Sequence, residues 1–253
     1  MTTPTAGSRR PRLGPGARGG LQLQLAAAVT LILLLPFGLL LLLVTDHWQP
    51  LRRLDFRLAA QLNQYAFAHR GYVTFLKVVT TVGHPAVFEA VTVAISVWLL
   101  VRRRRRLVAW LAVTVFGGGL LSTIVKHAVG RKRPLLPHPV AHAASASFPS
   151  GHAVGSVVGV GALLLIFLPS ARRAVPPAFI ALGVLVVVAI GFSRLGLGLH
   201  YLSDVLGGYL LGAGWLAVTA ACTVWRRDLA PPDQLRRQDL APADPEPRGG
   251  GST

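Results

Sequence analysis

Six stretches of this 253-residue chain are almost free of charge, and they restrict the folds open to it. The first has more than 20 apolar or uncharged residues in a row, which is enough for one helix to cross a bilayer. The composition agrees, because 52% hydrophobic residues and a mean hydropathy of +0.54 are typical of a membrane protein. We therefore expect an all-α polytopic membrane protein, a bundle of six transmembrane helices at residues 21–44, 85–101, 107–125, 153–168, 177–192 and 205–224.

The segment between the first two spans has a different pattern. Between residues 45 and 84, leucines recur at helical spacing, with arginines and glutamines on the opposite side. This pattern favours a helix that lies in the membrane interface. Residues 1–20 and 226–253 are rich in Pro, Gly and charged or polar residues, so we expect two disordered tails around a membrane domain at 21–225.

The net charge of +17 might suggest a nucleic-acid partner, but the basic residues lie between apolar runs without interleaved aromatics. They indicate membrane topology instead. The run Arg102–Arg106 and the basic tails predict that both termini are cytoplasmic in a multi-pass protein of the cell membrane. The single cysteine, Cys222, excludes an intrachain disulfide and a cysteine-based metal site.

The stretch 193–204 combines Arg194, His200 and Asp204. If a helix begins near Tyr201, Asp204 lies one turn beyond His200 on the same face. Its carboxylate would then accept the Nδ1 proton and leave Nε2 as a nucleophile. The alternative is a polar helix start between two buried segments.

A second motif lies at the outer end of the third span, where Lys126 and Arg133 precede Pro134. Positive charge on an outer loop runs against the topology rule, and a dianionic ligand would explain it. A solvated interfacial patch is the alternative interpretation.

The third motif, Pro149-Ser150-Gly151-His152, precedes the fourth span. Ser150 is a natural N-cap, Gly151 permits close approach to the backbone, and the helix start favours an anion. A Ser-Gly cap alone is common. In the six-span topology, however, all three motifs lie on the outer side of the membrane, which predicts one anion site there.

In chain order, the three motifs resemble the three-part signature of the type 2 phosphatidic acid phosphatase superfamily. The likeness covers residues 126–204 with every spacing intact, and the six spans extend it over about residues 21–225. The resemblance implies that His200 attacks phosphorus to form a phosphohistidine, that Asp204 orients His200, and that His152 protonates the leaving oxygen. It also implies a phosphate-binding set that needs no metal or cofactor: Lys126, Arg133, Ser150, Gly151 and Arg194. The signature gives no role to His127, Arg131, Lys132, His138 or His142.

The expected function is hydrolysis of a lipid phosphate or diphosphate at the outer face, with a lipid substrate and the bilayer as partners. Undecaprenyl diphosphate, phosphatidylglycerol phosphate and phosphatidic acid all fit the signature. Two alternatives stay open: an enzyme like the vanadate-dependent haloperoxidases, and a lipid-phosphate binder or transporter without turnover. The oligomeric state and the roles of His84 and Glu89 are also open.

Overall fold

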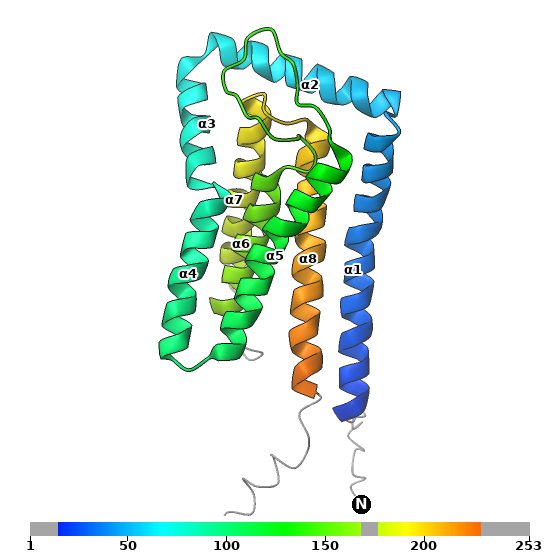
Figure 1. Cartoon of the computed structure of the whole chain (residues 1–253), viewed down its shortest axis with the longest axis vertical. Coiled ribbons are helices and arrows are strands. Elements are labelled where there is room, and N and C mark those ends of the chain that lie inside the picture. The colour runs from blue at the N-terminus through cyan, green and yellow to red at the C-terminus, as the bar shows by residue number, and fades with distance from the viewer. Residues whose placement is uncertain (1–14, 168–176, 229–253) are drawn as a thin grey trace, which may run out of the picture.

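The computed structural model describes residues 15–167 and 177–228, and within these ranges it contains eight helices and no strand. This confirms the expected all-α class. Apart from α2, which crosses one end of the bundle, the helices run roughly along one direction (Figure 1). The helices are α1 (Pro15–Thr45), α2 (Gln49–Ala68), α3 (Arg70–Val82), α4 (Pro85–Val101), α5 (Arg105–Val129), α6 (Gly151–Phe167), α7 (Pro177–Gly196) and α8 (Leu202–Asp228).

The outer surface of the bundle is apolar, as a membrane protein requires. Ile32 and Leu35 on α1 are each 68% exposed, and Leu185 on α7 is 63% exposed. Extended apolar surfaces of this kind mark contact with lipid or with another protein. In the described part of the chain, five helical stretches are long and apolar enough to span a bilayer: Ala27–Thr45, Arg70–Val101, Arg105–Val129, Pro177–Gly196 and Leu202–Cys222. With 17 residues, α6 is shorter, so the count of six spans stays a prediction.

The segment 45–84 forms two helices, α2 and α3, that run in different directions (Figure 1). The helix α2 lies across the end of the bundle, but α3 turns and runs along it into α4 (Figure 1). The second apolar stretch therefore begins at Arg70 and not at Pro85 as expected. The helical path is interrupted only between the end of α3 at Val82 and the start of α4 at Pro85. Nδ1 of His84 accepts the amide N–H of Ala86 at 3.2 Å and thereby caps α4.

The tails expected at 1–20 and 226–253 are only partly within the described ranges. The helix α1 begins at Pro15, inside the first of them, and α8 ends at Asp228, inside the second. Residues 1–14 and 229–253 lie outside the described residues.

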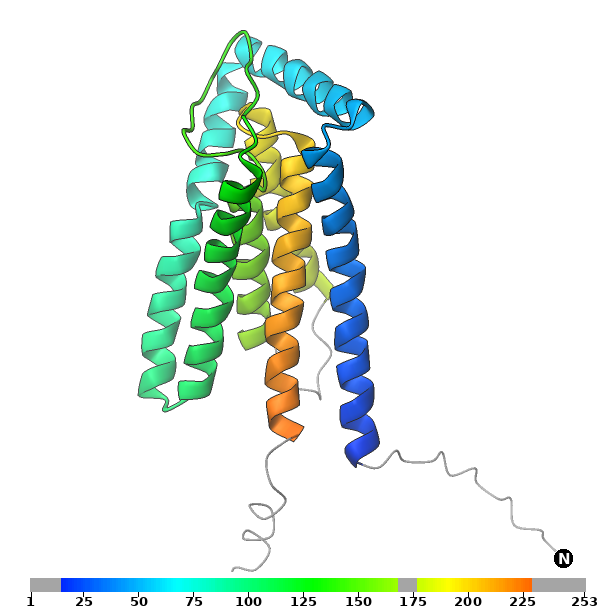
Figure 2. The same cartoon turned by 45° about the vertical axis from the view of Figure 1, so that its right-hand side comes forward.

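Close packing of α6 against α8 sets the position of the predicted motifs. A Cβ atom at Gly208 of α8 would lie 2.7 Å from the carbonyl oxygen of Ser150, and one at Gly212 would lie 3.1 Å from that of Val154. Only glycine permits this approach of the two backbones. As a result, the first turns of α6 and α8 meet at the end of the bundle that α2 crosses (Figure 2).

Candidate active site

The residues singled out from the sequence meet at that end of the bundle. The loop between α5 and α6 folds over it in both views (Figures 1 and 2). The last turns of α5 and α7 supply Lys126 and Arg194, and the loop supplies Arg133. The remaining five residues lie at or just before the starts of α6 and α8.

His200 has a defined tautomer because its two ring nitrogens face different partners. Nη1 of Arg133 lies 3.1 Å from Nε2. A guanidinium group only donates hydrogen bonds, so Nε2 is the unprotonated nitrogen and Nδ1 carries the proton. Oδ2 of Asp204 lies 3.5 Å from Nδ1. The free lone pair of His200 therefore faces the cationic side of the site, as nucleophilic attack on a phosphate requires.

Asp204 is fully buried and surrounded by donors. Its Oδ2 accepts the backbone N–H of Tyr201 at 2.8 Å and the hydroxyl group of Ser147. Its Oδ1 accepts Nη1 of Arg131 at 2.7 Å. The oxygen of Ser147 also lies 3.5 Å from Nδ1 of His200. These contacts fix the carboxylate next to the imidazole ring.

The surroundings keep His200 neutral. Burial lowers the pKa of His200 to about 4, and the positive charges of Arg133 and Arg194 act in the same direction, against the opposing effect of Asp204. Near neutral pH the imidazole therefore carries no charge, and the lone pair on Nε2 stays available.

A second group of residues surrounds the start of α6. A Cβ atom at Gly151 would lie 3.7 Å from Nζ of Lys126 and 3.8 Å from Oγ of Ser122. The ammonium group of Lys126 thus lies next to the helix start, and its distance to the carbonyl oxygen of Ala146 is 3.5 Å. A helix N-terminus next to an ammonium group is a favourable place for an anion.

Three buried polar atoms in the described residues have no hydrogen-bond partner: Oγ of Ser122, Oγ of Ser150 and Nε of Arg194. Unsatisfied buried donors cost free energy, and they are rare in native structures. All three are donors, and the oxygens of a phosphate group are acceptors. Nη1 of Arg194 is held by Oγ1 of Thr80 on α3 at 2.7 Å.

His152 belongs to the same cluster. The positive charges of Arg194 and Lys126 both lie near enough to act on its ring. The ring of His84 lies edge-on to it, with 5.1 Å between the ring centroids. His84, whose role the sequence leaves open, thus lies beside His152. Glu89 faces α5, where its Oε1 is 3.9 Å from the Cβ position of Gly119.

Three residues that contact the site received no site role from the sequence: Asp55 on α2, and Arg131 and Ser147 in the loop. Arg131 bridges Asp55 and Asp204, although the signature gives it no role. One signal for Asp55 was available, because it is the only acidic residue in the basic helix α2. In the described ranges, no group of three or more His, Cys, Asp or Glu residues has an arrangement that could hold a metal ion.

Comparison with known proteins gives consistent results. Residues 107–228 match the sequence profile of the PAP2 superfamily. Phosphatidylglycerophosphatase B of Bacillus subtilis (strain 168) is 40% identical over 106 residues, which are 40% of this chain and 51% of that protein. Lipid A 1-phosphatase of Rhizobium etli is 37% identical over 122 residues, which are 45% of this chain and 48% of that protein. The chain therefore spans about half the length of these curated relatives.

The fold also matches a solved structure. The crystal structure of a transmembrane PAP2-type phosphatidylglycerolphosphate phosphatase from Bacillus subtilis superimposes with a TM-score of 0.65 at 23% identity. The match covers 77% of this chain and 96% of that chain. It extends beyond the profile match to most of the helical bundle, and it agrees with a multi-pass membrane protein.

Proposed function

We propose that this chain, whose residues 107–228 match the sequence profile of the PAP2 superfamily, is a membrane hydrolase that releases phosphate from a lipid phosphate or diphosphate. The matched segment contains all eight residues of the proposed site. The observation that carries the proposal is the position of His200, with Arg133 at Nε2 and Asp204 at Nδ1.

The proposed reaction has two steps. Nε2 of His200 forms a bond to phosphorus while the bond from phosphorus to the leaving oxygen breaks, and His152, in its imidazolium form beside the bound phosphate anion, donates a proton to that oxygen. His200 loses no proton from Nε2, and the positive charge that develops on the ring is stabilised by Asp204. Water then attacks the phosphohistidine, His152 accepts a proton from it, and the nitrogen–phosphorus bond breaks to release phosphate.

The cationic residues would supply what metal ions supply in other phosphoryl-transfer enzymes. Lys126, Arg133 and Arg194 neutralise the charge on the non-bridging oxygens as it redistributes in the transition state. The hydroxyl group of Ser150 and the amide of Gly151 add hydrogen bonds at the start of α6. Since Arg133 contacts Nε2, a bound phosphate would draw this guanidinium onto its oxygens and expose the nucleophile.

The substrate class follows from the setting of the site. The apolar helices would hold the site next to a bilayer, where the phosphate group of a lipid can reach it while the lipid chains stay in the membrane. One relative is named for phosphatidylglycerophosphate and another for the 1-phosphate of lipid A, and both compounds carry a phosphate on a lipid anchor. We place the site at the outer face because the arginine-rich segments predict cytoplasmic termini.

The nucleophile is tested by replacing it. In detergent-solubilised protein, His200→Ala should lower phosphate release by about a thousandfold or more, the scale of losing a catalytic nucleophile. His142→Ala, in the exposed part of the loop, is the matched control and should retain activity. Wild-type protein denatured in alkali during turnover of ³²P-labelled substrate should retain label, and His200→Ala should not. Substantial turnover by His200→Ala would refute the mechanism.

The substrate is tested with a panel of undecaprenyl diphosphate, phosphatidylglycerol phosphate, phosphatidic acid and a soluble phosphoester. We expect the lipid substrates to give higher kcat/KM than the soluble ester. Each assay is repeated in excess EDTA, where full activity is expected. A loss of activity that Mg²⁺ restores would contradict the metal-independent mechanism.

A further inference from the structure

Behind the catalytic pair lies a buried ion-pair network that the signature does not include. The two carboxylates of Asp55 and Asp204 are 1% and 0% exposed. Arg131 lies between them, with Nη2 at 2.8 Å from Asp55 and Nη1 at 2.7 Å from Asp204. Nη1 also donates to the hydroxyl group of Ser203 at 2.7 Å. One guanidinium group thus joins the surface helix α2 to the start of α8.

We propose that Arg131 and Asp55 are positioning residues that set the orientation of Asp204 and, through it, the reactive tautomer of His200. This inference rests on the proposed function. It assigns a catalytic consequence to two residues outside the signature, and it makes α2 part of the active-site machinery.

The role of Arg131 follows from the geometry at Asp204. Because Arg131 holds Oδ1, the carboxylate cannot rotate freely, and Oδ2 stays directed toward Nδ1 of His200. Without Arg131, Asp204 would be a buried carboxylate that lacks a cation, which is unfavourable. Burial alone would lower the pKa of Arg131, but Asp204 and Asp55 outweigh burial and raise it, so the guanidinium keeps its charge.

The role of Asp55 is to hold Arg131 and the first turn of α8 together. Its Oδ1 accepts the backbone N–H of Ser203 at 3.0 Å, and its Oδ2 accepts the Ser203 hydroxyl group as well as Arg131. A carboxylate at the N-terminus of a helix is also favoured by the helix dipole. The start of α8, which carries Asp204, is therefore fixed by a residue of α2.

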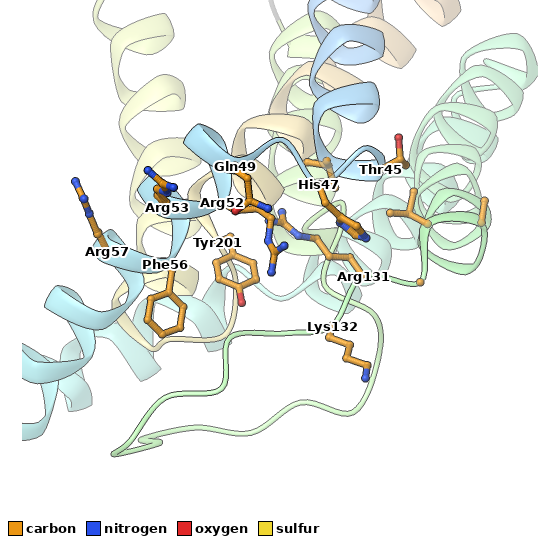
Figure 3. A pocket seen from close by; sticks show the side chains of 14 residues that line it. Thr45, His47, Gln49, Arg52, Arg53, Phe56, Arg57, Arg131, Lys132 and Tyr201 are labelled. Atoms are coloured by element: carbon orange, nitrogen blue, oxygen red, sulfur yellow. The ribbon is translucent and has the colours of Figure 1, made fainter.

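Arg131 is accessible from outside through a pocket of about 820 Å³ below α2. Its side chain is 14% exposed, and its guanidinium carbon lies 4.4 Å from the ring centre of Tyr201. Figure 3 shows Arg131, Tyr201 and Arg52 close together in this pocket. The pocket gives a small cation a route to the place of the Arg131 side chain, and this permits a chemical-rescue experiment.

The experiment compares Arg131→Ala with and without added guanidinium ion, at millimolar concentrations far below those that denature proteins. In Arg131→Ala we expect kcat to fall by about a hundredfold with little change in KM, because a displaced catalytic group loses rate and not substrate affinity. Added guanidinium should raise the kcat of Arg131→Ala at least tenfold, and sodium chloride at equal ionic strength should not raise it. Arg131→Lys should keep an intermediate rate.

Two controls separate positioning from general damage. Arg52 lines the same pocket as Arg131, but it makes no ion pair in the described residues. The variant Arg52→Ala should therefore keep wild-type kcat and show no response to guanidinium. Asp55→Asn should lower kcat, and adding it to Arg131→Ala should lower kcat little further, because both act through Asp204. Asp55→Asn also tests the inference if Arg131→Ala does not fold.

The outcomes are distinct from those that test the proposed function. If wild-type protein releases phosphate and Arg131→Ala or Asp55→Asn retains wild-type kcat, the positioning role is wrong while the function stands. A folded Arg131→Ala protein whose low kcat does not respond to guanidinium would also overturn the inference, since its role would then be structural. If wild-type protein hydrolyses no lipid phosphate, the proposed function itself fails.

Discussion

Replacing Asp204 by asparagine tests the tautomer of His200 directly, because the change preserves shape while it removes the negative charge and replaces one acceptor by a donor. Asp204 accepts hydrogen bonds on both oxygens, from Arg131 on Oδ1 and from Tyr201 and Ser147 on Oδ2, the oxygen that faces His200. An asparagine has one oxygen and one amide nitrogen, so it can satisfy only one of these two sides.

The structure decides which side would lose its acceptor. An amide nitrogen turned toward Arg131 would leave a charged donor facing another donor at 2.7 Å, which costs more than a conflict between neutral groups. The oxygen of the introduced asparagine is therefore expected to stay with Arg131, and its nitrogen to face His200. Nδ1 of His200 would then meet a donor in place of its acceptor, which destabilises the tautomer with a free lone pair on Nε2 although the contact with Arg133 favours that tautomer.

The expected effect is a fall in kcat of about 10³- to 10⁴-fold, the scale seen when the aspartate of a Ser-His-Asp triad becomes asparagine. This loss corresponds to about 4–5 kcal/mol of transition-state stabilisation. The fold should be retained, because Arg131 keeps its ion pair with Asp55 at 2.8 Å.

The assay is phosphate release under single-turnover conditions, with the melting temperature of the detergent-solubilised protein as a measure of folding. Asp46→Asn, in the exposed turn that follows α1, is the matched control and should keep wild-type kcat. A folded Asp204→Asn protein with kcat within about fivefold of wild type would contradict the tautomer argument, since a misplaced proton should cost far more.

Three further predictions concern packing, pH and topology. Gly208→Ala should lower both the melting temperature and kcat, because its Cβ would lie 2.7 Å from the carbonyl oxygen of Ser150, whereas Gly38→Ala has open space and should be neutral or slightly stabilising; equal effects would contradict the packing argument. Burial lowers the pKa of His200 to about 4, against about 6.5 in an unfolded chain. The unfolded state thus binds more protons between these values, and stability should fall as pH falls from about 6.5 to about 4. The melting temperature of wild type should therefore drop more between about pH 7 and about pH 5 than that of His200→Gln, and parallel drops would argue against a buried neutral imidazole. Finally, His138→Cys in the exposed loop should be labelled in intact cells by an impermeant thiol reagent, and labelling only after lysis would invert the proposed orientation.

The sequence was sufficient for the residues whose relation is local or set by the order of spans. His200 and Asp204 are four residues apart across a helix start, so helical periodicity alone places them together. Lys126, Ser150 and Arg194 lie at helix ends, and the alternation of spans brings those ends to one side. These relations need no knowledge of side-chain packing.

The contacts of Asp55 and Arg131 depend on tertiary structure and could not be predicted in this way. Asp55 lies 149 positions before Asp204, and its proximity depends on how α2 crosses the bundle. The buried face of α2 consists of Asp55, Ala59, Asn63 and Ala66, whereas Leu54 is 47% exposed. The apolar stripe that indicated an interfacial helix is thus divided, because Leu51 packs against the core whereas Leu54 and Tyr65 are exposed. The division of 45–84 into α2 and α3 was missed for a similar reason, since one amphipathic pattern was extended over both helices.

The apolar surface of the bundle has a consequence for how substrate reaches the site. Its exposed side chains, such as Ile32 on α1 and Leu185 on α7, face lipid in a membrane. A lipid phosphate would then approach the site by diffusing within the bilayer, so turnover should follow the mole fraction of substrate in the membrane and not its bulk concentration.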